Sequence, residues 1–90
     1  MKQDSKKKVL RRLSLIRGQV NGLVKMVEAE RYCVDIITQS SAIKEALLGV
    51  EDLMLENHLT THVIHQIKSG KDKKATSEIL KIYKLAQKKK

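Results

Sequence analysis

Residues 33–68 read CVDIITQSSAIKEALLGVEDLMLENHLTTHVIHQIK, and no other part of the chain constrains the fold as strongly. The stretch has no proline and one glycine, Gly49, and its apolar residues cover more than one face of a helix. We therefore expect one buried helix of about 35 residues, which at 1.5 Å per residue is about 50 Å long. A globule of 90 residues is narrower than this. The helix therefore needs a second chain beside it.

The flanking segments predict two further helices. Before the long helix, apolar residues recur at alternating spacings of four and three, the pattern of a helix packed lengthwise on another: Val9, Leu13, Ile16, Val20, Leu23 and Val27. Residues 28–31 indicate a short turn. Residues 69–72, SGKD, indicate a loop whose Gly70 suits a helix end, and a short third helix follows before the lysine tail at 88–90. The sequence predicts an all-α domain over residues 1–90, a three-helix protomer with a long central helix. Residues 1–8 are expected to form a flexible basic arm.

The charge of the chain points to a polyanionic partner. It has 19 Lys and Arg against 10 Asp and Glu, a net charge of +9. Nucleic acid is the commonest cytosolic polyanion, although composition alone does not separate DNA from RNA or anionic lipid. No helix-turn-helix or zinc-finger pattern is evident, so we expect a broad basic surface. Its candidate DNA-binding residues are Lys6, Lys7, Lys8, Arg11, Arg12 and Arg17.

Several protein classes are excluded by the same sequence. A single cysteine, Cys33, cannot form an internal disulfide, and the polar N-terminus is unlike a signal peptide, so we expect a reducing, cytoplasmic setting. No apolar run approaches the roughly 18 residues of a membrane span. The chain has no glycine-rich phosphate loop and no paired-carboxylate pattern. An enzyme is therefore not expected.

Three histidines suggest a metal site. His58, His62 and His65 stand at i, i+4 and i+7, which places them on one helix face, where two of them can share an ion. Cys33 lies 25 residues before His58, roughly 37 Å along one helix, and cannot reach it within one chain. In an antiparallel pair of this helix, Cys33 of one chain would lie beside His58 and His62 of the other, and two-fold symmetry would create two sites. The alternative is a lone cysteine packed as a small hydrophobe.

Short motifs then provide a family resemblance. RGQV at 17–20, RYCVDI at 31–36, NHL at 57–59 and His62 occur together, and over residues 6–87 the chain resembles the CsoR/RcnR/FrmR family of small bacterial repressors. The resemblance implies an antiparallel dimer that forms a four-helix bundle and pairs into a homotetramer. It also implies double-stranded operator DNA as a partner and an inducer site made by Cys33 of one chain with His58 and His62 of another.

Members of this family sense different inducers. Persulfide sensors carry a second cysteine where His58 stands, formaldehyde sensors an N-terminal proline, and nickel or cobalt sensors an N-terminal histidine; this chain has none of these. Copper sensors typically have Cys, His and Cys, and here the third position is His62. Tyr32 and Glu78 match the tyrosine and glutamate that surround the metal-binding histidine in copper sensors. Zn(II) would accept the same ligands with His65 or water as a fourth.

We therefore expect a repressor that binds operator DNA in the apo form and is released when Cu(I) binds between subunits. Within the family, the alternative is another inducer, such as nickel, cobalt, zinc or formaldehyde. Outside the family, the alternative is a basic helical nucleic-acid-binding protein that senses nothing.

Overall fold

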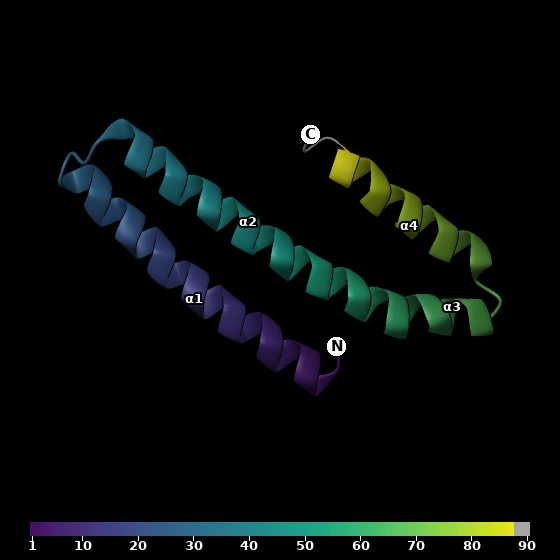
Figure 1. The fold of residues 1–90 in the computed structure, drawn as a ribbon. Helices are drawn as coiled ribbons and strands as arrows, with labels where there is room; N and C mark the ends of the chain where they lie inside the picture. The colour runs from purple at the N-terminus through teal and green to yellow at the C-terminus, as the bar shows by residue number, and fades with distance from the viewer. Residues whose placement is uncertain (88–90) are drawn as a thin grey trace. The chain divides into compact units, whose positions relative to one another are not determined.

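The computed structural model describes residues 1–87, which form helices joined by short turns and contain no strand. In chain order the elements are α1 (Gln3–Glu28), α2 (Cys33–His58), the π-helical turn η1 (Leu59–Val63), α3 (Ile64–Lys68) and α4 (Asp72–Gln87) (Figure 1). The predicted all-α fold is confirmed, while the lysine tail at 88–90 lies outside the described residues. The chain divides into two compact units, Met1–Glu56 and Asn57–Lys90. None of the described helices is long and apolar enough to cross a membrane.

The first unit is a helical hairpin in which α1 and α2 lie side by side (Figure 1). The predicted turn is confirmed: it follows Glu28 and contains Glu30 in a left-handed conformation with φ of 53°. The core of the hairpin consists of Val9, Ile16, Ile43 and Val50, with Leu13, Leu23, Ala46 and Leu53 packed against it. The predicted interface on α1 is therefore formed by four of the six residues of the four-three pattern, because these share one helix face: Val9, Leu13, Ile16 and Leu23. The other two, Val20 and Val27, are 41% and 55% exposed within the single chain.

The start of α1 differs from the expected basic arm. The helix begins at Gln3, so residues 3–8, predicted to lie outside it, are helical. Two physical features favour this outcome. Lysine is a good helix former, and Asp4 places a negative charge in the first turn, where it interacts favourably with the helix dipole. The lysines of the arm thus extend α1 by about one and a half turns.

The predicted extent of the central helix is confirmed, whereas its predicted burial is not reached within the single chain, where Val34, Ile37 and Leu47 are exposed. From Cys33 to Lys68 the residues are helical without interruption, as α2, η1 and α3. The helix ends just before Gly70, as the sequence predicts. Gly70 has φ of 77°, and its amide donates to the carbonyl of Ile67 at 3.1 Å. The π-helical turn η1 was not expected. It begins directly after His58, in a run rich in β-branched residues.

Candidate metal centre

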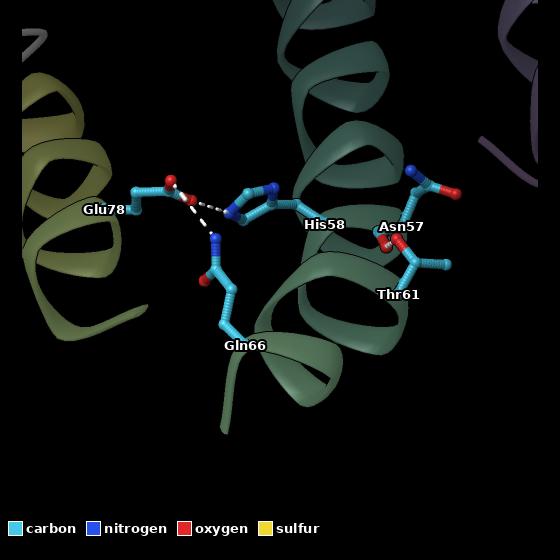
Figure 2. A network of polar contacts seen from close by, with 5 residues as sticks. All are labelled: Asn57, His58, Thr61, Gln66 and Glu78. Carbon is cyan, nitrogen blue, oxygen red and sulfur yellow. Dashed lines mark hydrogen bonds and ion pairs between the residues drawn. The ribbon is translucent and has the colours of Figure 1, made fainter. Parts of the chain in front are cut away.

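His58 and Glu78 meet in the second unit. His58 is the last residue of α2, and Glu78 lies on α4, where a backbone turn through Gly70 returns the chain. Atom Nε2 of His58 lies 2.8 Å from Oε2 of Glu78, an ion-pair distance, although the approach lacks hydrogen-bond geometry (Figure 2). About a quarter to a third of each side chain is exposed (26% and 32%). Partial burial protects the contact from full solvent screening.

Gln66 holds the other oxygen of the same carboxylate. Its Nε2 donates to Oε1 of Glu78 at 3.3 Å, and the residue is only 8% exposed (Figure 2). Glu78 is therefore held by groups from two places in the central helix, His58 and Gln66. Gln66 was not among the residues predicted from the sequence, because its partner Glu78 lies twelve residues away across a turn.

The π-helical turn η1 begins directly after His58 and contains His62. The ring centroids of His58 and His62 are 5.4 Å apart, with the ring planes tilted by 31°. Beside them, the carbonyl of the buried Asn57 accepts hydrogen bonds from the hydroxyls of Thr61, at 2.5 Å, and Thr60, at 3.3 Å. Such hydroxyl bonds to a preceding carbonyl perturb regular helix geometry. They accompany the turn that carries His62.

The remaining candidates are placed elsewhere. His65 is exposed, and the ring contact described within residues 1–87 joins only His58 and His62. Tyr32 and Cys33 lie in the first unit, at the start of α2. Cys33 is a free, exposed thiol and Tyr32 is 71% exposed, so neither is packed as a core residue within the single chain. Among residues 1–87 of one chain, no three His, Cys, Asp or Glu side chains are grouped to hold a metal ion.

The basic candidates share one helix. All six are exposed residues of α1, so their charges are available to solvent and to a partner: Lys6, Lys7, Lys8, Arg11, Arg12 and Arg17. Several cations on one helix concentrate positive charge more than the same cations dispersed over the fold would, and this favours binding of a polyanion.

Known proteins resemble this chain over nearly its full length. The family described as "Metal-sensitive transcriptional repressor" matches residues 5–85. The copper-sensing transcriptional repressor CsoR of Bacillus subtilis is 44% identical over 79 residues, 88% of this chain and 78% of that protein. The CsoR of Mycobacterium ulcerans is 35% identical over 77 residues, 86% of this chain and 66% of that protein.

A solved structure shares the fold. The copper-sensing repressor CsoR with Cu(I) from Geobacillus thermodenitrificans superposes with a TM-score of 0.89 at 36% identity, covering 97% of this chain and 91% of that one. These relatives are named as repressors, which confirms the expectation that the chain is not an enzyme. The matched residues include the imidazole pair, Glu78 and the basic residues of α1, and the chain belongs to the metal-sensitive transcriptional repressor family.

Proposed function

We propose that this chain is a cytoplasmic, Cu(I)-responsive repressor. As a homotetramer it binds operator DNA in the apo form, and it is released when Cu(I) binds at intersubunit sites. Each site takes Cys33 from one protomer and His58 and His62 from another. The relatives in Bacillus, Mycobacterium and Geobacillus are named as copper sensors, which supports this choice of ion.

The observation that carries the proposal is the orientation of His58. Its Nε2 faces Glu78, so its Nδ1 is the nitrogen that we assign to the ion (Figure 2). His62 lies in ring contact with it and supplies a second imidazole. A carboxylate on the distal nitrogen fixes the tautomer of a metal-binding imidazole and raises its basicity. The carboxylate that would do this for His58 already lies beside its distal nitrogen.

The donor set fits a soft ion of low coordination number. One thiolate with two imidazoles suits Cu(I), which supplies a soft centre that prefers sulfur and nitrogen to oxygen. One chain holds only the imidazole pair, in keeping with the lack of a three-residue cluster within residues 1–87. The thiolate of Cys33 from a second chain would complete the set.

Glu78 gives the site a way to act on the rest of the chain. When Nδ1 of His58 is engaged, the imidazole proton resides on Nε2, which can then donate to Glu78 at the 2.8 Å distance already present. Gln66 donates to the other carboxylate oxygen. A stronger His58–Glu78 bond ties α4 to the end of α2, and we propose that this shifts the tetramer away from its DNA-binding shape. Tyr32 is proposed to lie around the same imidazole.

One titration separates this proposal from its alternatives. Operator affinity is measured anaerobically while Cu(I), Zn(II), Ni(II), Co(II) or formaldehyde is added, with absorbance recorded in parallel. We expect Cu(I) to weaken DNA binding at the lowest free concentration. Release by another inducer at lower concentration would reassign the sensor within its family. Salt-dependent binding to every DNA sequence without release by any inducer would instead indicate a non-sensing nucleic-acid-binding protein.

Self-association is the first expected outcome. Large apolar side chains remain exposed in both units, among them Leu15 at 67%, Ile37 at 63% and Tyr83 at 59%. Burying such side chains gains free energy in proportion to their area, so we expect dimers or tetramers at micromolar concentration. Sedimentation velocity measures this directly. A stable helical monomer of 10.3 kDa would contradict the prediction.

A second expected outcome concerns the basic residues of α1. Arg12→Ala and Arg17→Ala should each weaken operator binding and flatten its dependence on salt, by about 0.9 in the logarithmic slope for each phosphate that is no longer neutralised. Lys81→Ala, which removes one exposed positive charge from α4, is the matched control and should leave the slope nearly unchanged. Fluorescence anisotropy at several salt concentrations gives the slopes. Wild-type slopes in both arginine variants would place the DNA surface elsewhere.

A further inference from the structure

The side chain of Arg12 extends from α1 to Gly49, the one glycine of α2. Its Nη1 lies 2.8 Å from the point where a Cβ on residue 49 would stand. The two glycines of α1 differ, because nothing comes within 4 Å of that point at Gly18 or Gly22. Arg12 also lines a recess of the hairpin together with Leu15, Ile16, Gln19 and Ala46. One end of the guanidinium thus lies against α2, while Arg12 as a whole remains exposed.

The backbone does not require glycine at position 49. Within residues 1–87, Gly70 is the one glycine with positive φ, so Gly49 has an ordinary helical conformation that alanine adopts more readily. Glycine in a helix interior is destabilising relative to alanine. The contact with Arg12 is therefore the feature of this position that a methyl group would change.

We infer that Gly49 is a positioning residue for DNA binding. Because it has no side chain, it leaves room for the guanidinium of Arg12 beside α2. This inference rests on the proposed function, in which Arg12 contacts a DNA phosphate. A free arginine loses much of its rotamer freedom when it is fixed on a phosphate, whereas a seated one has already given up part of it. An added Cβ at 2.8 Å would displace the guanidinium, which is the far end of a flexible side chain, and would leave the backbone in place.

Gly49→Ala should therefore move stability and DNA affinity in opposite directions. The unfolding midpoint should rise by a few degrees, because alanine is the better helix former. Operator affinity should fall by about 3-fold to 10-fold, because the guanidinium of Arg12 is displaced from its position beside α2. A purely structural role for Gly49 would not separate the two readouts in this way. Gly22→Ala is the matched control, with the same gain in helix propensity, open space at the new Cβ and an expected wild-type DNA affinity.

The experiment measures operator binding by anisotropy, and unfolding by circular dichroism, for the full chain and for Gly49→Ala, Arg12→Ala and the double variant. We expect the double variant to bind DNA no more weakly than Arg12→Ala alone, because Gly49 acts through Arg12. Wild-type affinity in Gly49→Ala, or additive losses in the double variant, would overturn the inference while leaving the proposed function intact. Wild-type affinity in Arg12→Ala would instead remove Arg12 from the proposed DNA surface, and the inference would fall with it.

Discussion

Cys33→Ser is expected to lower Cu(I) affinity by at least about 100-fold. Loss of a group that only orients a metal ligand typically costs 10-fold to 100-fold, and here the ligand itself changes from a soft thiolate to a hard hydroxyl. Cys33 is exposed in the single chain, so the substitution creates no cavity in the hairpin core. Competition with a chromogenic Cu(I) chelator under anaerobic conditions measures the change.

His65→Gln provides the comparison for this variant. His65 is exposed and outside the ring contact of His58 and His62, so its loss should leave Cu(I) binding unchanged. If Zn(II) affinity falls in His65→Gln, His65 completes a four-ligand zinc site. Full release of DNA by Cu(I) in Cys33→Ser would refute the proposed site.

Glu78→Gln is expected to separate metal binding from DNA release. Glu78 has an acceptor oxygen for each of two partners, Nε2 of His58 and Nε2 of Gln66. A glutamine has one oxygen and one NH₂ group, so one of the two donors would face another donor. Cu(I) affinity should stay near the wild-type value, because the ligands are untouched. The ratio of DNA affinities without and with Cu(I), typically about 5-fold to 150-fold in coupled systems, should fall toward one.

The measurement compares operator affinity of wild type and Glu78→Gln at zero and saturating Cu(I). Glu45→Gln removes the same charge from an exposed position of α2 and should retain wild-type coupling. A wild-type affinity ratio in Glu78→Gln would refute the transmission route and leave the metal site standing. Linkage provides a second check, since the same coupling appears as a change in Cu(I) affinity when DNA is bound.

The residues around His58, where the metal site is proposed, show how much the sequence alone could predict. The i, i+4 spacing of His58 and His62 predicted that their imidazoles share a face, and the structure confirms it with a ring contact. The resemblance placed Glu78 beside His58, and the 2.8 Å contact agrees. The role of Gln66 could not be predicted in this way. Its partner Glu78 lies twelve residues away across a turn, and no helical period relates positions 66 and 78.

Local chemistry by itself determined the helix boundaries. The pattern break after Glu28, the new start at Cys33 and the stop at Gly70 each depend on a few neighbouring residues, and each is confirmed. The start at Gln3 differed from expectation because helix propensity and the charge of Asp4 outweigh the polarity of the first residues. Membership in a family of repressors was also readable from short motifs, and the match over residues 5–85 confirms it.

Only the tertiary structure decided which distant groups touch. The seat of Arg12 at Gly49 needs α1 and α2 packed in one register, and the double hold on Glu78 needs α4 folded back past Gly70. The spacing of residues along one helix is set by its repeat of 3.6 residues, and it can be read from the chain. The spacing between helices is set by how side chains interdigitate in a core such as Val9, Ile16, Ile43 and Val50, and it exists only once they pack.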